Sequence, residues 1–232
     1  MAERLRLLSF IDGEDGYCAL VDDGGGASAL RADGQGTLEA RSDAPISEGR
    51  ATLDSSRGEL EVSWTPAGAG IQFGVGDAIV EAHAIASSGH AAGEPLSGPG
   101  VAWDLPVGGY SALRTLWATN AKGSLVLLVA LRADEAHDHG EELIGAARLI
   151  PGAEPYGYLE PLLSTEYDAS GAHVRATLEL WPSAEEHVPE RGGGLRTAGG
   201  SLVASGGRLE AARFAWSLDG SPATGGYEIL TP

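Results

Sequence analysis

GYLEPLLSTEYDASGAHVRATLELW, residues 157–181, decides the fold class of this chain. It predicts two antiparallel strands joined at residues 168–171, where Asp, Ser and Gly supply the backbone freedom and side-chain caps of a tight turn. The second strand alternates with a period of two, which is typical of a strand with one face in a core and the other in water. One face carries Val174, Ala176, Leu178 and Leu180, and the other carries His173, Arg175, Thr177 and Glu179. We expect this hairpin to organise the fold.

The same strand-and-turn pattern recurs along the chain. Residues 58–64 alternate and are followed by a Pro/Gly-rich break at 66–70, and residues 78–86 read as another strand. Residues 124–132 are apolar on both faces, which predicts a strand covered on both sides. The 35 glycines among 232 residues show no collagen period and mark turns between strands. No segment combines a helical period with caps, so the sequence predicts an all-β fold, an antiparallel β-barrel or sandwich.

Residues 87–100, SSGHAAGEPLSGPG, are the best candidate for a linker. They are rich in Gly, Ser and Pro and lack periodicity. We expect a linker or long loop here, between an N-terminal β unit at residues 1–90 and a C-terminal β unit at 101–232.

The composition of the chain limits its possible binding partners and cellular location. The formal net charge of −18 argues against nucleic acid, because neutralising phosphates requires clustered Lys and Arg. Cys18 is the only cysteine, so no intrachain disulfide forms. The N-terminus does not resemble a signal peptide, and the longest apolar run is too short to span a bilayer. We expect a cytoplasmic protein without a membrane span.

Common catalytic motifs are missing. The sequence contains no GxSxG elbow, no GxxxxGK[ST] loop, no dinucleotide-binding GxGxxG between a strand and a helix, and no HExxH. These absences disfavour the usual hydrolase, NTPase and dehydrogenase functions, and we expect no cofactor.

One possible metal site is His137 with His139. Two histidines at i and i+2 share a strand face and can bind one metal ion with a carboxylate. Glu141 and Glu142 follow very closely, and the alternative is a solvated turn rich in acid and His.

A second candidate is Glu81 with His83, which we place on one strand face with Ile79 and Ile85. A carboxylate and an imidazole on an apolar face can perform acid–base chemistry. The alternative is an edge strand whose polar residues face water.

The third candidate is a set of carboxylates beside aromatic residues. Asp104 follows Trp103, Glu160 is expected on a strand face with Tyr158 and Leu162, and acidic residues flank Tyr167. An acid in an apolar pocket stays protonated and can donate a proton, while aromatic faces stabilise a cation. The alternative is exposed acids that keep a sheet soluble. The five tryptophans are expected in the core or in a cavity wall.

Four short patterns carry a family resemblance. They are LSTEYD at 163–168, LELW at 178–181, FAWSLDG at 214–220 and GGYE at 225–228. With these, residues 111–228 resemble the C-terminal part of the lipocalin-like (calycin-type) proteins related to carotenoid hydratase, or hydroxyneurosporene synthase. The resemblance implies two lipocalin-like β units packed together, a cavity for a large apolar ligand and, in some members, acid-catalysed hydration or cyclisation. No catalytic residue of the family maps onto a matched motif.

These observations lead to three functional hypotheses. The first is binding of a hydrophobic small molecule, isoprenoid-like or polycyclic, in a β-barrel cavity, with hydration or cyclisation of an alkene as its enzymatic form. The second is a non-enzymatic carrier or interaction module, in which an oligomer is possible, and the third is a metal-dependent enzyme using His137 and His139. The candidate catalytic acids are Glu160, Asp104 and Glu81, and the candidate ligand-binding residues are Trp103, Trp117, Tyr158, Tyr167 and His83.

Overall fold

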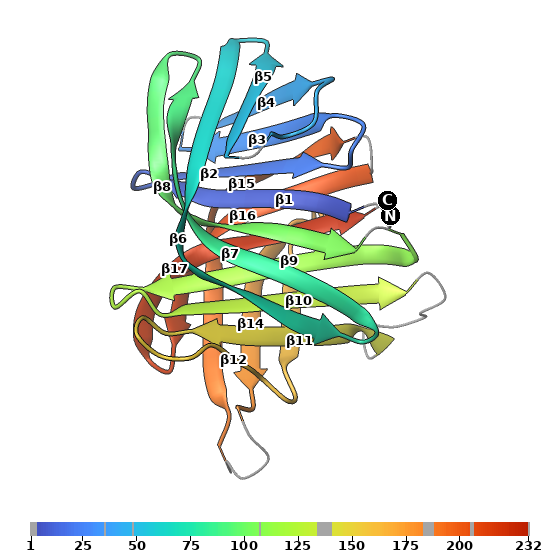
Figure 1. The fold of residues 1–232 in the computed structure, drawn as a ribbon, viewed down its shortest axis with the longest axis vertical. Coiled ribbons are helices and arrows are strands. Elements are labelled where there is room, and N and C mark those ends of the chain that lie inside the picture. Colours follow the sequence, from blue (N-terminus) through green and yellow to red (C-terminus); the bar gives the residue numbers. More distant parts are fainter. Residues whose placement is uncertain are drawn as a thin grey trace.

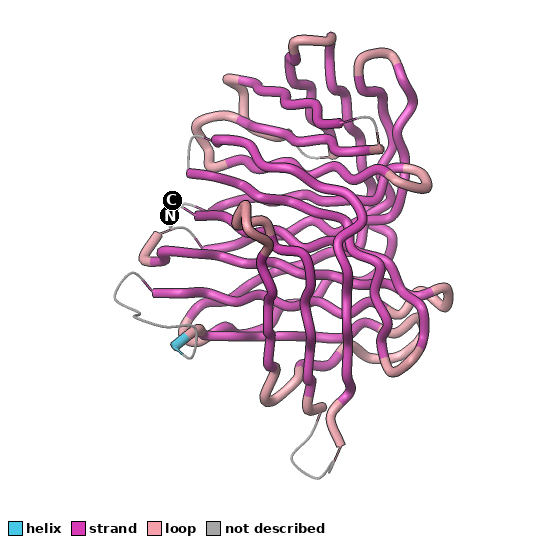
Figure 2. Tube along the Cα trace, turned by 180° about the vertical axis from the view of Figure 1, so that it is seen from behind, coloured by secondary structure: helices cyan, strands magenta, loops and turns pink. Residues whose placement is uncertain are grey.

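The computed structural model describes residues 4–34, 36–47, 49–106, 108–133, 141–182, 188–204 and 207–231. These residues form seventeen β-strands and contain no α-helix. Figure 2 shows strands joined by loops, and the one short helical segment drawn in cyan is the 3₁₀ turn at Glu141. The strands are β1 (Arg4–Asp12), β2 (Gly16–Asp22), β3 (Ala27–Asp33), β4 (Gly36–Ser42), β5 (Arg50–Ser55), β6 (Gly58–Val75), β7 (Ala78–Ala91), β8 (Glu94–Pro106), β9 (Tyr110–Asn120), β10 (Leu125–Ala133), β11 (Leu143–Leu149), β12 (Tyr156–Gly157), β13 (Leu162–Tyr167), β14 (His173–Leu180), β15 (Glu190–Ala204), β16 (Gly207–Leu218) and β17 (Ser221–Thr231). The predicted all-β antiparallel fold is confirmed, and the described part holds no helix of the length and apolarity needed to cross a bilayer.

Strands β1 to β8 form a closed antiparallel barrel, and the other nine form one curled sheet (Figure 1). In the barrel each strand pairs with the next, and β8 returns to pair with β1. The order in the sheet is β12-β11-β10-β9-β17-β16-β15-β14-β13. Strands β6 and β7 are long enough to leave the barrel wall and cross over β10 and β11 of the sheet.

Three hydrophobic cores follow from the alternation of side chains along the strands. One core takes residues from all eight barrel strands, among them Leu8 and Phe10, and therefore fills the barrel. A second core contains Leu5 and Leu7 of the same strand, β1, together with residues of the sheet. This core therefore joins the barrel wall to the sheet. The third lies within the curl of the sheet. Barrel strands beside the sheet are therefore buried on both faces, as the fully buried β2 illustrates.

The predicted linker at residues 87–100 is wrong, because these residues lie in β7, in β8 and in the two-residue turn between them. The turn is Ala92-Gly93, both with positive φ, which is the conformation of a tight hairpin. Gly98 and Gly100 are strand residues of β8. Both positions require glycine, because a Cβ at either would overlap a carbonyl oxygen of β1. The change from barrel to sheet falls later, between β8 and β9.

The predicted hairpin at 157–181 is confirmed as β13 and β14, with Ala176, Leu178 and Leu180 buried as expected. It lies at one edge of the sheet, so it does not organise the fold. His173, expected in water, is buried, and the pairing of β13 with β14 shifts register beside it. The predicted break at 66–70 is also wrong, because β6 continues through it with an irregularity between Pro66 and Gly70.

A buried polar network joins the barrel to the sheet. The Tyr17 hydroxyl of β2 donates to Glu228 Oε1 of β17, and Thr115 Oγ1 donates to Glu228 Oε2 at 2.6 Å. Trp117 Nε1 donates to Ser9 Oγ at 2.8 Å in the same interface. Burial raises the pKa of Glu228 well above its usual range, so the neutral carboxyl is favoured.

Glu228→Gln should make stability less dependent on pH. An unfolded glutamate loses its proton near pH 4.3, about its unperturbed value, whereas folded Glu228 keeps it. The unfolding free energy of the wild type should therefore fall, relative to that of the variant, as pH rises through the window between the two pKa values. The relative change should approach about 1.4 kcal/mol per pH unit. Urea unfolding of both proteins between pH 4 and 8 measures it, and parallel pH profiles would contradict the assignment.

Candidate functional site

A cavity of about 430 Å³ opens at the mouth of the barrel, between β1, β6, β7 and β8. Its apolar wall includes Leu8, Trp64 and Ile85, and its polar groups include Arg6, His83 and Asp104. The remaining lining residues are Gly49, Pro66, Ala102 and Trp103. Apolar walls with a few converging polar groups are typical of small-molecule sites.

The polar residues at this mouth form one row across four strands. Arg6 pairs with Asp104, Asp104 with Glu81, and Glu81 with Gln72 in the strand register. Arg6 Nε lies 3.5 Å from Asp104 Oδ1. Two carboxylates at directly opposite positions of neighbouring strands destabilise a sheet. Such a local conflict in an otherwise consistent fold is most often found at functional sites.

Glu81 also contacts the imidazole of His83 on its own strand. Glu81 Oε1 lies 2.8 Å from His83 Nε2, and Gln72 Nε2 donates to Glu81 Oε2 at 3.2 Å. The side chains of Glu81 and His83 are 29% and 36% exposed, so water and a ligand can both reach them. A carboxylate that orients an imidazole is a frequent acid–base arrangement.

Three of the predicted site residues therefore meet at one place, namely Asp104, Glu81 and His83. The face predicted to hold Ile79, Glu81, His83 and Ile85 runs from the barrel core, where Ile85 is buried, outward to solvent, where Ile79 is 57% exposed. The conflicting expectation of an edge strand is wrong, because β7 pairs on both sides.

Other predicted residues lie elsewhere. Glu160 is exposed in the bend between β12 and β13, so its expected place on a strand face beside Tyr158 is wrong. Tyr158 is buried in the sheet and its hydroxyl donates to Glu190 Oε2 at 2.7 Å. Tyr167 is 43% exposed at the end of β13. Trp117 is fully buried in the core between barrel and sheet, as is Trp103, which also lines the cavity.

Sequence reasoning missed Arg6 and left Trp64 unassigned between core and cavity wall. A usable signal existed in β1, where Arg6 lies between Leu5 and Leu7. His137 and His139 lie outside the described residues, so the metal site stays a prediction. Among the described residues, no group of three or more His, Cys, Asp or Glu is placed to hold a metal ion.

A larger groove of about 650 Å³ lies on the outer surface of β13, β14 and β15. Leu162, 55% exposed, contributes to it, and Glu179 and Arg191 form an ion pair of 3.3 Å across it. Its acid and base neutralise each other at the surface, so it offers less chemistry than the barrel mouth.

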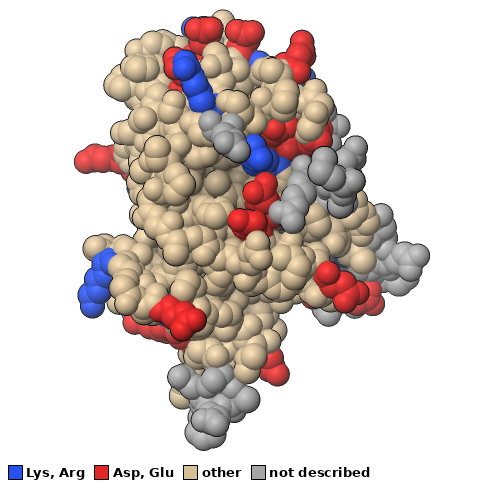
Figure 3. Space-filling model, viewed as in Figure 1, with Lys and Arg blue, Asp and Glu red and all other residues tan. Residues whose placement is uncertain are grey.

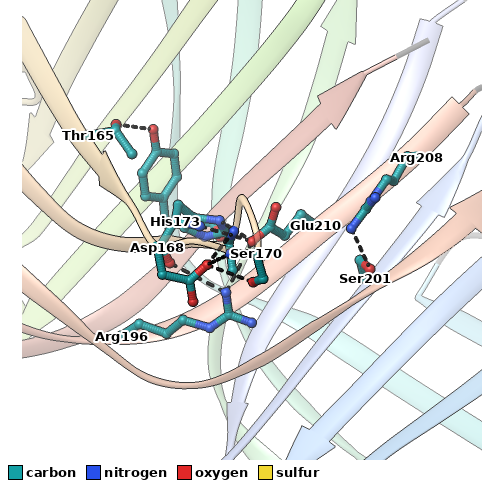
Figure 4. A network of polar contacts seen from close by, with 10 residues as sticks. Thr165, Asp168, Ser170, His173, Arg196, Ser201, Arg208 and Glu210 are labelled. Carbon is teal, nitrogen blue, oxygen red and sulfur yellow. Dashed lines mark hydrogen bonds and ion pairs between the residues drawn. The ribbon is translucent and has the colours of Figure 1, made fainter.

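Inside the curl of the sheet lies a second polar group that the sequence did not reveal (Figure 4). His173 Nδ1 lies 2.8 Å from Glu210 Oε1, and His173 Nε2 lies 3.0 Å from the carbonyl oxygen of Tyr227. Arg196 donates to the same Glu210 oxygen at 3.1 Å. The imidazole stacks on Phe214 with the ring planes 7° apart. Each ring nitrogen of His173 thus faces an oxygen atom that can accept a hydrogen bond.

The His173–Glu210 pair therefore holds the fold rather than reacting with a ligand. Its imidazole is fully enclosed, with a side-chain exposure of 0%. Hydrogen bonds from His173, and the charges of His173 and Arg196, outweigh the effect of burial and lower the pKa of Glu210.

Glu210→Gln should cost about 2 kcal/mol of unfolding free energy at pH 7, the usual size for hydrogen bonds to a charged group. Because the folded pKa of Glu210 is depressed, this stabilisation exists above the unfolded pKa and disappears as pH falls through the folded pKa. Chemical denaturation at pH 7 and pH 3 measures the loss. The control is Glu166→Gln, whose exposed pair with Arg175 at 3.7 Å should contribute under about 0.5 kcal/mol. Equal losses in the two variants would contradict the assignment.

No family model and no curated protein matches the sequence. Among solved structures, the fold matches kievitone hydratase from Nectria haematococca with a TM-score of 0.61 at 10% identity, over 99% of this chain and 89% of that one. It also matches a protein of Nitrosomonas europaea described as a candidate AttH, with a TM-score of 0.62 at 12% identity, over 98% of this chain and 92% of that one. These matches support the predicted lipocalin-like relationship at the level of the fold. They span barrel and sheet together, so a resemblance limited to residues 111–228 is too narrow.

Proposed function

We propose that this protein binds a hydrophobic small molecule at the mouth of the β1–β8 barrel. The observation that carries the proposal is the cavity of about 430 Å³, where the apolar wall meets Asp104 and His83. Its volume lies within the range of roughly 300–1,000 Å³ that is usual for small-molecule sites. An apolar ligand body would lie against Trp64, Leu8 and Ile85, with its polar or unsaturated part toward the row of charged residues.

We further propose hydration of a carbon–carbon double bond as the chemistry of this site. In this mechanism Asp104 would enter the cycle as a neutral carboxyl, favoured by the like charge of Glu81 opposite it and by exclusion of water when the apolar ligand binds. It would donate its proton to one alkene carbon, and the face of Trp64 would stabilise positive charge on the other. Water would then bond to that carbon while His83, oriented by Glu81, accepts the proton that the water loses. Return of this proton to Asp104 restores both groups, so the net reaction adds one water to the ligand. Kievitone hydratase, a protein of the same fold, carries this reaction class in its name.

A non-enzymatic carrier is the second candidate, and it would use the same cavity. It is favoured by the contacts that already engage the acids, since Asp104 lies beside Arg6 and Glu81 contacts both His83 and Gln72. In a carrier these contacts keep the rim of the mouth in shape, and the ligand leaves chemically unchanged.

Binding can be tested with the uncharged fluorescent probe Nile red. We expect Trp64→Ala to weaken its binding at least tenfold, equivalent to about 1.4 kcal/mol, because the variant removes one of the two tryptophans that line the cavity. Glu160→Gln, on the other sheet and exposed, should bind like the wild type and serves as the control. Equal affinity of the wild type and Trp64→Ala would place the binding site elsewhere.

The acid variants separate enzyme from carrier. With the apolar molecule extracted from protein purified from its own host, Asp104→Asn and His83→Gln should abolish a mass gain of one water. Their Nile red affinity should stay within about threefold of the wild type, since neither change removes apolar wall. Glu160→Gln should retain turnover. Turnover that survives in Asp104→Asn and His83→Gln would exclude the hydration mechanism, and an unchanged ligand with the wild type would identify a carrier.

A further inference from the structure

The imidazole of His83 lies directly over Gly70, its cross-strand partner on β6. A Cβ at Gly70 would overlap Cε1 and Nδ1 of the imidazole, so the ring can occupy this place only over a glycine. The irregularity between Pro66 and Gly70 lies immediately before this contact. There β6 departs from the barrel wall toward the sheet, as Figure 1 shows.

Gln72 is the next residue of β6 on the same face, and it completes the arrangement from the other side. Its amide donates to Glu81 Oε2 at 3.2 Å, while Glu81 Oε1 lies 2.8 Å from His83 Nε2. Both carboxylate oxygens are thus engaged, which fixes the orientation of the carboxylate. A carboxylate oxygen facing Nε2 requires the hydrogen of a neutral imidazole to be on Nε2, and the lone pair is then on Nδ1.

We propose that Gly70 and Gln72 are positioning residues that hold the Glu81–His83 pair in one tautomer, with Nδ1 of His83 as the proton acceptor of the site. Gly70 places no side chain against Cε1 and Nδ1 of the ring, and Gln72 keeps the Glu81 carboxylate aimed at Nε2. Charged groups beside the pair in the described part of the chain include Asp104, opposite Glu81, and Arg6, opposite Asp104. The role of Nδ1 in proton transfer rests on the proposed function, but the orientation of the pair can be measured without any ligand.

The test is a pH titration of the ligand-free protein, followed by the ¹⁵N and ¹H signals of the histidine rings. The signals of His83 are identified as those lost in His83→Gln. The wild type should show the Nε2–H tautomer in the neutral form. Gly70→Ala should displace the ring, and Gln72→Ala should release the carboxylate. Each should mix the Nε2–H and Nδ1–H tautomers.

Gly68→Ala is the matched control, because it lies in the same irregular stretch of β6 and a Cβ there meets open space. It should leave the His83 signals unchanged. Gln72→Ala keeps the test decisive if Gly70→Ala does not fold.

Two outcomes would overturn the inference. One is a mixed tautomer in the wild type, and the other is an unchanged His83 tautomer in folded Gly70→Ala or Gln72→Ala. A merely structural role would lower stability and leave the tautomer as it was. Nile red binding reports on the proposed function separately, so it can fail while the His83 result stands, or the reverse.

Discussion

The barrel wall packs onto the nine-stranded sheet. This packing determines which side chains along β1, β2, β7 and β8 point toward the sheet. Leu7, Tyr17, Val80 and Trp103 lie in this contact, and Glu228 of the sheet accepts the hydroxyl of Tyr17 within it. A buried carboxyl without partners would cost several kcal/mol, so Tyr17 and Thr115 are needed where they are. The same contact requires glycine at position 226, because a Cβ at Gly226 would overlap the Tyr17 hydroxyl.

The intervening side chains of the same strands must then face the barrel interior. This alternation places the side chains of the candidate site. Leu8 and Ile85 pack inside the barrel, while Arg6, His83 and Asp104 follow on the same face toward its open end. The interior itself is filled by side chains from all eight strands, so space for a ligand is found at the mouth. The mouth also combines conflicting charges, because Asp104 and Glu81 stand on neighbouring strands with Arg6 on one side and His83 on the other. Acidic and basic side chains are otherwise dispersed over the face drawn in Figure 3.

Local patterns were sufficient to predict the strands, and long-range contacts were not visible in them. The alternation of β14 and the two-sided apolar pattern of β10 predicted both strands correctly. The linker prediction for residues 87–100 was wrong for two reasons. Gly98 and Gly100 allow the close approach of β8 to β1, and the turn Ala92-Gly93 lacks the Asn or Asp typical of such turns. The sequence indicated the pair Glu81 with His83 and, separately, Asp104, but the meeting of Asp104 with this pair depends on the register of β7 with β8. The burial of His173 and Glu228 depends on partners 37 and 211 residues away, Glu210 and Tyr17.

Native mass spectrometry of the protein from its own host can show whether the barrel mouth holds an apolar molecule. Wild type and Trp64→Ala should be purified side by side and any bound molecule released by denaturation. We predict an apolar adduct on the wild type that is lost or strongly reduced in Trp64→Ala. A wild-type chain without adduct, or the same adduct at the same occupancy on both proteins, would contradict it.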